Sequence, residues 1–322
     1  MSEALRVAVL GGGPDAEREI SLASSRAVAH ALSGAADVVY AVVDRPDPPM
    51  LRALGVDVIF PALHGRSGEG GPLQDALAAS GVAFVGCGPS AARLAMDKLA
   101  TKLVARGAGV PTPEACVFDP FDGVSAIGMP AVVKPTHEGS SVALFVARDG
   151  GGWAEAHAGA CAWVRGAPGR TMLVERFVRG RELPVGLLDQ GMDMGAGLAA
   201  LPLVEVMPAG GVYDFDAKYG RDDTRYVVEP DLPAGVAAAL SERALAVARA
   251  LGVRHMARAD FMLPADGGEP MLLEINTMPG FTARSLLPMA AARAGLDLPA
   301  LCAHLVTIAK RDGPAEIGQE SD

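Results

Sequence analysis

The first third of the chain alternates short apolar runs with longer amphipathic stretches. Four runs have the length of β-strands: 6–10, 38–43, 56–63 and 82–85. An amphipathic helix is expected between the first two, from about Glu17 to Leu32. Strands separated by helices predict a parallel sheet, whose ligands bind beyond the carboxyl ends of the strands. We therefore expect the segments Gly11–Glu17 and His64–Glu69, which follow two of the strands, to line a site.

The rest of the chain predicts mixed α+β structure. A helix is expected from Ser90 to Arg106, because Gly107 and Gly109 follow it and Pro111 lies beyond. Further strands are expected at 131–134, 142–146, 172–177 and 183–188, with a helix at 154–163. From residue 201 onward the pattern predicts a strand, a polar loop at 213–226, an alanine-rich helix at 234–251, two strands joined at Gly267-Gly268, and C-terminal helices.

Composition and charge limit the class of protein. Half of the 322 residues are hydrophobic and 20% are charged, which is typical of a globular chain of two or three domains. The formal net charge of −10 argues against a broad nucleic-acid-binding surface, which needs clustered Lys and Arg. No apolar run approaches the roughly 18 residues of a membrane span, and the N-terminus lacks the pattern of a signal peptide. We expect a cytoplasmic protein with neither nucleic-acid nor membrane partners.

The cysteines predict neither a disulfide framework nor a zinc site. Cys87, Cys116, Cys161 and Cys302 are far apart and form no C-x-x-C pair. We expect four buried or incidental thiols.

Two neighbouring strands near the C-terminus carry polar side chains with a spacing of two. Arg258 and Asp260 share one face of the first strand, and Glu274 and Asn276 share one face of the second. The Ala-Asp-Gly-Gly connection predicts that the strands are antiparallel neighbours. Two carboxylates and an amide oxygen then suit Mg²⁺ or Mn²⁺. The alternative is a solvated face with ordinary salt bridges, but Leu273 and Ile275 fix the opposite face as core.

Two loops have the composition of anion-binding loops. Gly280 follows the second strand, and a glycine there lets backbone N–H groups approach an anion closely. Lys134 ends a strand and precedes Gly139-Ser140-Ser141, which suits phosphate oxygens, although a surface turn is an equal alternative for this segment alone. It is not a Walker P-loop, and Gly11-Gly12-Gly13 lacks the G-x-G-x-x-G pattern of a dinucleotide site. Glu175 and Glu182 have the chemistry to accept hydrogen bonds from ribose or adenine groups, and solvated glutamates are their alternative.

Nine segments, collinear over nearly the whole chain, resemble motifs of the D-alanine–D-alanine ligase family of the ATP-grasp superfamily. They are 12–22, 63–69, 96–98, 133–142, 174–175, 180–183, 213–219, 258–260 and 273–286. Three of the five lysines, Lys98, Lys134 and Lys218, fall within them.

The resemblance implies an α/β chain with a three-domain ATP-grasp architecture. An N-terminal domain with a parallel sheet is expected over residues 1–97, a central ATP-grasp subdomain over 98–190, and a C-terminal subdomain with the metal and substrate sites over 191–322. ATP is expected between the second and third domains, with two Mg²⁺ or Mn²⁺ ions. The resemblance also suggests a homodimer, although no segment of the sequence identifies its interface.

The resemblance also implies roles for individual residues. The expected nucleotide contacts are Lys98, Lys134, Glu138, Ser141, Glu175, Glu182 and Leu273. The expected metal ligands are Asp260, Glu274 and Asn276. The expected substrate contacts are Glu17, which would grip the ammonium of the first D-alanine, with His64, Lys218, Ser285 and Leu286. Arg258 and the Gly280 N–H would stabilise an oxyanion, and Ser140 and Tyr219 would join Glu17 in a hydrogen-bonded group over the site.

The reaction implied is the ATP-dependent, ADP-forming ligation of two D-alanines through D-alanyl phosphate, for peptidoglycan precursor synthesis. The loop Tyr213–Tyr226 is the candidate lid that keeps water from the acyl phosphate. Tyr219 disfavours a ligase that makes a D-alanyl ester, because enzymes of this family that use D-lactate tend to carry Phe there. Another ATP-grasp carboxylate–amine ligase and a non-catalytic ATP-binding paralogue are the remaining alternatives.

Three positions depart from the family pattern. Asp15 stands where the family usually has Ser, Gly70 where an Asp is common, and Ala143 where a Gly usually closes the Ser-Ser-Val segment. None of them removes an expected catalytic group. Ala143 is expected to stiffen or shift the phosphate loop.

Overall fold

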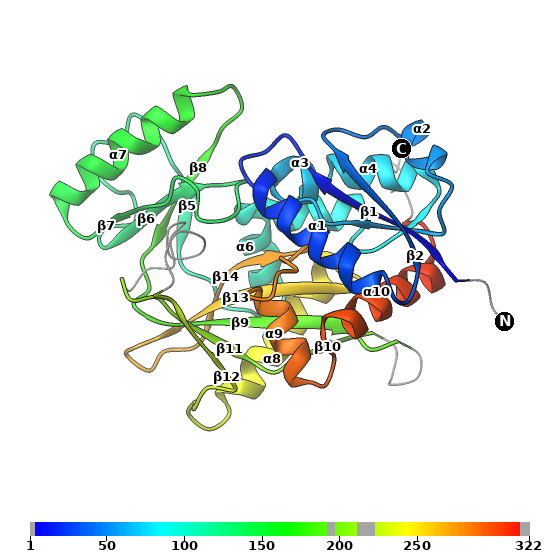
Figure 1. The fold of residues 1–322 in the computed structure, drawn as a ribbon. Helices are drawn as coiled ribbons and strands as arrows, with labels where there is room; N and C mark the ends of the chain where they lie inside the picture. The colour runs from blue at the N-terminus through cyan, green and yellow to red at the C-terminus, as the bar shows by residue number, and fades with distance from the viewer. Residues whose placement is uncertain (1–3, 192–196, 211–222, 316–322) are drawn as a thin grey trace.

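The N-terminal part of the molecule is a four-stranded parallel sheet. The computed structural model describes residues 4–191, 197–210 and 223–315 (Figure 1). The sheet has the order β2-β1-β3-β4, and every pair in it is parallel, as the alternating pattern predicted. Its strands are β1 (Arg6–Gly12), β2 (Asp37–Val43), β3 (Val58–Pro61) and β4 (Ala83–Phe84). Its helices are α1 (Arg18–Leu32), α2 (Pro48–Ala53), α3 (Gly65–Glu69), α4 (Pro72–Ser80) and α5 (Pro89–Met96).

The second sheet is small, antiparallel and covered by one helix. Its order is β5-β8-β6-β7, from β5 (Ala115–Val117), β8 (Met172–Arg176), β6 (Ala131–Pro135) and β7 (Phe145–Ala147). Helix α7 (Gly150–Arg165) packs on β6 and β7 and contributes Trp153, Ala156 and Ala160 to a separate core. In Figure 1 this lobe stands at the upper left, apart from the other two sheets.

The third sheet is the largest and lies between helices. Its path is β12-β11-β9-β13-β14, with β10 paired to β9. The strands are β9 (Gly180–Asp189), β10 (Leu198–Ala200), β11 (Val204–Met207), β12 (Arg225–Val228), β13 (Met256–Pro264) and β14 (Met271–Asn276). Helices α6 (Lys98–Gly107) and α8 (Val236–Leu251) pack on it, and α9 (Leu286–Arg293) lies against β9, β11 and β12. Helix α8 ends where Gly252 adopts a left-handed conformation, with φ of 72°.

The expectation of one continuous helix from Ser90 to Arg106 is wrong, because the helix is interrupted at Asp97. This residue is extended, with φ of −81° and ψ of 104°, and separates α5 from α6. Its carboxylate accepts from the backbone N–H groups of Leu99 at 2.9 Å and Ala100 at 3.1 Å. Asp97 is therefore the N-cap of α6, a role that an aspartate fills well.

The expected strand at 142–146 is also shorter than predicted. Pairing with β6 begins only at Phe145. Ser141 and Ala143 adopt left-handed conformations, with φ of 57° and 52°, and a residue in that region cannot continue a strand.

Sheet membership divides the chain differently from the expected boundary at residue 190. Strand β9 belongs to the third sheet, so the change from the second sheet falls between Arg176 and Gly180. Helix α6 contacts β14 and α8, and its Ala105 joins the core of the third sheet. The segment at 98–107 therefore packs with the C-terminal part of the chain.

The first and third sheets share a core. Helix α10 (Leu298–Asp312) packs against α1, β3 and β4, so the C-terminal helix covers the N-terminal sheet (Figure 1). The rings of Phe60 and Phe281 meet edge to face, with centroids 5.1 Å apart. Buried His255 accepts from the Gly86 N–H through Nδ1 at 3.0 Å. These contacts fix the two sheets against each other.

Within the described ranges, no single helix has the length and apolarity of a membrane span. Helices α9 and α10 meet those criteria only as a pair, with a bend of 98° between them.

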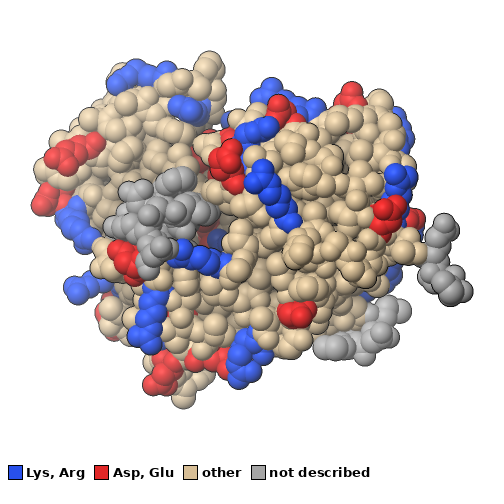
Figure 2. Space-filling view, in the orientation of Figure 1, with Lys and Arg blue, Asp and Glu red and all other residues tan. Residues whose placement is uncertain are grey.

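On the face shown in Figure 2, the surface is hollowed between the lobe of α7 and the rest of the molecule, and charged side chains of both signs lie along the rims.

Candidate functional site

The four polar residues of β13 and β14 lie together, as the spacing of two predicted. The strands are antiparallel, and Arg258 pairs with Asn276 and Asp260 with Glu274. The expectation that Leu273 lies on the core face is wrong: the pairing shifts between Asp260 and Phe261, and Leu273 lines the same cavity as Glu274. The guanidinium of Arg258 donates from Nε to Asp260 Oδ1 and from Nη2 to Asp260 Oδ2, both at 2.7 Å. Asn276 Nδ2 donates to Asp260 Oδ2 at 3.1 Å. Asp260 is 5% exposed, while Arg258, Glu274 and Asn276 are half-buried, so the cluster has a buried centre and is not an ordinary solvated face.

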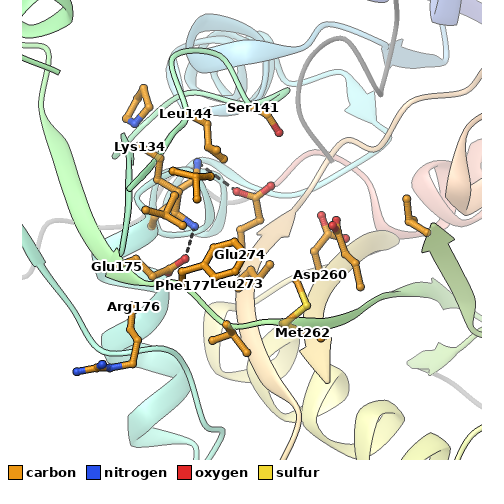
Figure 3. Close-up of a pocket in the computed structure, with 18 of the residues that line it drawn as sticks. Lys134, Ser141, Leu144, Glu175, Arg176, Phe177, Asp260, Met262, Leu273 and Glu274 are labelled. Carbon is orange, nitrogen blue, oxygen red and sulfur yellow. Dashed lines mark hydrogen bonds and ion pairs between the residues drawn. The ribbon is translucent and has the colours of Figure 1, made fainter. Parts of the chain in front are cut away.

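A cavity of about 320 Å³ lies between the second and third sheets, and we call it the inter-sheet cavity. All seven residues expected to contact a nucleotide line it: Lys98, Lys134, Glu138, Ser141, Glu175, Glu182 and Leu273. Apolar side chains complete its walls, among them Val132, Leu144, Val146, Phe177 and Met262. Figure 3 shows Lys134 and Glu175 of the second sheet lying across the cavity from Asp260, Met262 and Glu274 of the third sheet. A mostly apolar cavity with a few convergent charges is typical of a cofactor site.

Ion pairs organise the inter-sheet cavity. Lys134 Nζ lies 2.9 Å from Glu175 Oε1 (Figure 3). Lys98 Nζ lies 3.3 Å from Glu274 Oε2. Lys98 Nζ also donates to the carbonyl of Glu138 at 2.6 Å. Burial opposes the charged form of Lys134, but the carboxylates of Glu175, Glu274 and Glu182 raise its pKa above the ordinary value. The lysine is therefore a stable cation inside the cavity.

Lys102 is a member of this cluster that the sequence analysis missed. It is 2% exposed, and its Nζ forms an ion pair with Glu175 Oε2 and donates to Thr112 Oγ1 at 2.7 Å. Burial lowers the pKa of Lys102 to about 8, against the raising effect of Glu175. The sequence feature that could have identified Lys102 is its position four residues after Lys98, which places both lysines on one side of a helix.

A second cavity, of about 380 Å³, adjoins the β13–β14 cluster on the other side. We call it the second-substrate cavity, because it is the second of the two cavities and the residues expected to contact the amino-acid substrates line it. It is lined by all the expected catalytic and substrate-binding residues that the structure describes: Glu17, His64, Ser140, Arg258, Gly280, Ser285 and Leu286. Glu274 lines both cavities, so the cluster forms the wall that they share. Lys218 and Tyr219, and most of the expected lid at 213–226, lie outside the described residues.

Loops of the first and second sheets meet at Glu17. Its Oε1 accepts a hydrogen bond from Ser140 Oγ, which joins the loop after β6 to the N-terminal domain. Ser140 has a left-handed backbone, with φ of 53°. A side chain at Gly139 would lie only 3.0 Å from Glu17 Oε1, so glycine permits the close approach. Glu17 is 6% exposed and faces a cavity, as a group that binds an ammonium requires.

Glu69 is a second buried acid that sequence reasoning gave no role. Its carboxylate accepts from the backbone N–H groups of Gly65 and Met278, each at 3.3 Å. Burial, with the nearby charge of Glu17, raises the pKa of Glu69 to about 8. Burial also lowers the pKa of His64 to about 4, and its Nε2 lies 3.2 Å from Ser24 Oγ. Near neutral pH this wall therefore carries a neutral imidazole and a partly protonated carboxyl group.

The loop that follows β14 is a tight turn built around Ser285. Ser285 Oγ accepts from the Thr282 N–H at 3.0 Å, and the Ser285 N–H donates to the carbonyl of Thr282 at 2.9 Å. A side chain at Gly280 would lie 2.8 Å from Ser285 Oγ, so only glycine allows this packing. The turn holds the Gly280 and Ser285 segments at the wall of the second-substrate cavity.

Two of the three departures have structural explanations. The carboxylate of Asp15 accepts from the Ser67 N–H at 2.6 Å and from Ser67 Oγ at 3.2 Å, so it joins the loops that follow β1 and β3. At Gly70, a side chain would come within 2.4 Å of the carbonyl oxygen of Arg66, so the present backbone does not accept an Asp there. Ala143 is left-handed, which is a conformation that glycine adopts more readily.

The β13–β14 cluster has the donor chemistry of a magnesium site. Among the described residues, no group of three or more His, Cys, Asp and Glu side chains is arranged to hold a metal ion. Asp260, Glu274 and Asn276 form a mixed set of two carboxylates and one amide oxygen; Asp260 pairs with Glu274, and Asn276 lies two residues further along the same strand as Glu274. Mg²⁺ commonly binds through one or two carboxylates together with substrate phosphates. The residues present fit such an ion.

Comparison with known proteins gives one consistent family. The family described as "D-ala D-ala ligase C-terminus" matches residues 120–307. A D-alanine–D-alanine ligase of Bordetella petrii is 40% identical over 94% of this chain and 91% of its own length. One from Azoarcus sp. is 40% identical over 95% of this chain and 97% of its own length.

Solved structures agree with this family. The D-alanine–D-alanine ligase of Bacillus anthracis, in a crystal structure complexed with ATP, superposes with a TM-score of 0.78 at 25% identity. The match covers 96% of this chain and 98% of that one. The D-alanine–D-alanine ligase of Coxiella burnetii has the same fold, with a TM-score of 0.78 at 24% identity over 97% and 95% of the two chains. With two adjoining cavities that hold the expected residues and near full-length similarity, this chain belongs to the D-alanine–D-alanine ligase family.

Proposed function

We propose that this chain is an ATP-dependent ligase that joins two molecules of D-alanine and forms ADP, phosphate and D-alanyl-D-alanine. The observation that carries the proposal is the shared wall between the two cavities. Arg258, Asp260 and Glu274 lie where a phosphoryl donor in the inter-sheet cavity would meet an amino acid in the second-substrate cavity. The relatives named D-alanine–D-alanine ligase supply the substrate class.

ATP is assigned to the inter-sheet cavity. Lys134 and Lys98 supply charge for phosphate oxygens, and the loop with Glu138 and Ser141 lies beside them. Glu175, Glu182 and Leu273 line the remaining wall and would contact the base and ribose. The neighbour from Bacillus anthracis, which holds ATP, supports this assignment.

Two Mg²⁺ or Mn²⁺ ions are assigned to Asp260, Glu274 and Asn276. Their chemistry when bound is to neutralise the phosphate oxygens and the charge that develops during phosphoryl transfer. Arg258 and Lys98, which neutralise the carboxylates of Asp260 and Glu274 in this structure, lie beside the same site.

The two D-alanines are assigned to the second-substrate cavity. Glu17 accepts from the ammonium of the first, while Ser285 and Leu286 position the second, and His64 lines the same wall. Ser140 holds the carboxylate of Glu17 by a hydrogen bond. Lys218 and Tyr219, outside the described residues, complete the proposed group.

The chemistry follows from the low electrophilicity of a carboxylate. The carboxylate oxygen of the first D-alanine attacks the γ-phosphoryl group of ATP, and ADP leaves. The deprotonated amine of the second D-alanine then attacks the acyl carbon, and the tetrahedral oxyanion collapses with loss of phosphate. Arg258 and Gly280 line this cavity, and we assign the Arg258 guanidinium and the Gly280 N–H to stabilise that oxyanion, as fixed donors in a water-poor site do.

In the cell the product is a precursor of peptidoglycan, as in the rest of the family. We also propose a cytoplasmic location and a homodimer. Cell fractionation and sedimentation of the purified chain test these two points.

The proposed reaction is tested by phosphate release from ATP with D-alanine, L-alanine or D-lactate as the added substrate, and by mass identification of the product. We expect phosphate release and the dipeptide with D-alanine alone. Release that does not depend on D-alanine would contradict the proposal. Formation of a D-alanyl ester with added D-lactate would favour the mixed-product alternative.

A further inference from the structure

Three buried charged residues meet at one end of the inter-sheet cavity. Glu175 is 3% exposed, Lys102 2% and Lys134 7%. Glu175 Oε1 lies 2.9 Å from Lys134 Nζ, while Glu175 Oε2 forms its ion pair with Lys102 Nζ. Each oxygen of the carboxylate therefore has its own lysine.

The two lysines differ in their surroundings. Lys134 lines the inter-sheet cavity, and the carboxylates of Glu274 and Glu182 also act on it. Lys102 lies outside the lining and behind Glu175, and its Nζ is held by Thr112 Oγ1 at 2.7 Å. Lys134 is thus within reach of a ligand in the cavity, whereas Lys102 is anchored away from it.

The Lys102–Glu175 ion pair also joins the second sheet to a helix that packs on the third sheet. Lys102 stands on α6, which packs against β14 and α8 of the third sheet, whereas Glu175 stands on β8 of the second sheet. A buried ion pair between α6 and β8 fixes the position of the Glu175 carboxylate relative to both walls of the cavity. Removal of one partner of a buried pair leaves an uncompensated charge, which is strongly unfavourable.

Binding of ATP would change which lysines pair with the carboxylate of Glu175. The phosphates of ATP are the stronger partners for Lys134, because they carry more charge than a single carboxylate. If Lys134 turns to them, Glu175 Oε1 loses its cation and Glu175 depends on Lys102 alone. The two lysines together hold the pKa of Glu175 below its ordinary value, although burial opposes this.

We propose that Lys102 is the permanent counter-ion of Glu175 and positions its carboxylate to select the nucleotide base. An ionised carboxylate only accepts hydrogen bonds, and adenine presents an exocyclic amino donor where guanine presents a carbonyl oxygen. With Lys102 in place, Glu175 Oε1 is an acceptor that favours ATP over GTP. The proposal rests on the assignment of ATP to the inter-sheet cavity. Lys102 acts through Glu175 and is a positioning residue, not a catalytic one.

The test is the full-length variant Lys102→Met, with Lys102→Arg as the conservative variant and Lys310→Met as the control. Lys310 is exposed on α10 and pairs with Asp57 at 2.8 Å, far from the cluster in the chain's fold. Direct titration with ATP and with GTP gives the two dissociation constants, and steady-state assays give kcat and the KM values for ATP and D-alanine.

In Lys102→Met we expect affinity for ATP to fall about tenfold, the scale of one buried charge-assisted contact. Affinity for GTP should change less, so the preference for ATP falls, while the KM for D-alanine stays within about twofold of wild type. Lys102→Arg should restore most of the preference, and Lys310→Met should match wild type. An unchanged ATP preference in Lys102→Met, or equal losses for both nucleotides, would overturn the proposal.

A double variant tests the route of the effect. If Lys102 acts through Glu175, then Lys102→Met combined with Glu175→Gln should bind ATP no worse than Glu175→Gln alone. Additive losses would contradict that route. Should Lys102→Met fail to fold, Glu175→Gln still tests the route through Glu175, because an unchanged preference for ATP in that variant would overturn the proposal. Titration needs no turnover, so this outcome is separate from failure of the ligase assay.

Discussion

Arg258 and Asp260 stand two residues apart on β13 and are joined by two parallel hydrogen bonds, each 2.7 Å long. The guanidinium side chain lines the second-substrate cavity, while the carboxylate lines the inter-sheet cavity. This pair therefore connects the proposed oxyanion site with the proposed metal site. A metal ion that binds Asp260 competes with Arg258 for the same oxygens.

The first prediction concerns Arg258. We expect Arg258→Ala to abolish dipeptide formation, because loss of a preorganised donor to an oxyanion costs about 100-fold or more in kcat. ATP binding, measured by titration, should remain largely intact. Arg293→Ala is the control, since Arg293 forms an exposed pair with Glu229 on the surface. Near-normal turnover in Arg258→Ala would remove its assigned role.

Glu274 gives a prediction about metal dependence. It lines both cavities and pairs with Lys98 at 3.3 Å. We expect Glu274→Gln to raise the Mg²⁺ concentration for half-maximal activity by about tenfold or more, because an amide replaces a charged ligand. The matched variant is Glu269→Gln, whose side chain is 71% exposed and pairs with Arg243. Identical Mg²⁺ curves for the two variants would argue against Glu274 as a ligand.

The packing of Phe281 gives a prediction about stability. Its fully buried ring meets Phe60 edge to face, and its N–H donates to Ser24 Oγ at 3.3 Å. Phe281→Ala should lower the free energy of unfolding by about 3–5 kcal/mol, through lost burial and the resulting cavity. Phe121 is 95% exposed, so Phe121→Ala should change it by less than about 0.5 kcal/mol. Urea unfolding measures both, and equal stabilities would contradict the shared core.

His255 predicts a loss of stability in mild acid. It is fully buried; Nδ1 accepts from Gly86, so Nε2 carries the proton and donates to Asp312 at 3.2 Å. Burial, with the charge of Arg254, lowers its pKa from 6.5 to about 4. The unfolded chain therefore binds the proton first as the pH falls. The stabilisation is complete above pH 6.5 and is lost between pH 6.5 and 4, on the order of 3 kcal/mol in all.

Urea midpoints measured from pH 7.5 to 4.5 check this prediction. Between pH 6.5 and 4.5, the variant His255→Gln should lose less stability, relative to its own value at pH 7.5, than wild type does. Burial also lowers the pKa of His64 to about 4 and raises the pKa of Glu69 to about 8; these two shifts act in opposite directions and are common to both proteins. His30→Gln is the control, as His30 is exposed on α1. A wild-type slope in His255→Gln would show that another group controls acid stability.

The β13–β14 cluster could be predicted from the sequence because its geometry is local. The period of two sets the faces of both strands, and a Gly-rich turn joins them. The antiparallel pairing and the shared polar patch followed from those two features, whereas the exact register, with its shift between Asp260 and Phe261, did not. The parallel order of the N-terminal sheet followed in the same way from alternating strands and helices.

Other features depended on tertiary contacts. The pattern from 90 to 106 is compatible with one helix, and only the structure shows Asp97 as the cap of a second one. Lys102 looks like an ordinary helix lysine until β8 brings Glu175 to it. The packing of α10 on the N-terminal sheet joins segments more than 200 residues apart, and no local pattern encodes that.

The most direct test of the acyl-phosphate mechanism follows an oxygen atom. D-alanine labelled with ¹⁸O in its carboxylate is incubated with ATP and the enzyme, and the released phosphate is analysed by mass spectrometry. If the carboxylate of the first D-alanine attacks the γ-phosphoryl group, the phosphate released with each dipeptide carries one ¹⁸O from that carboxylate. Phosphate without the label, released together with dipeptide, would contradict an acyl phosphate formed at the wall of Arg258, Asp260 and Glu274.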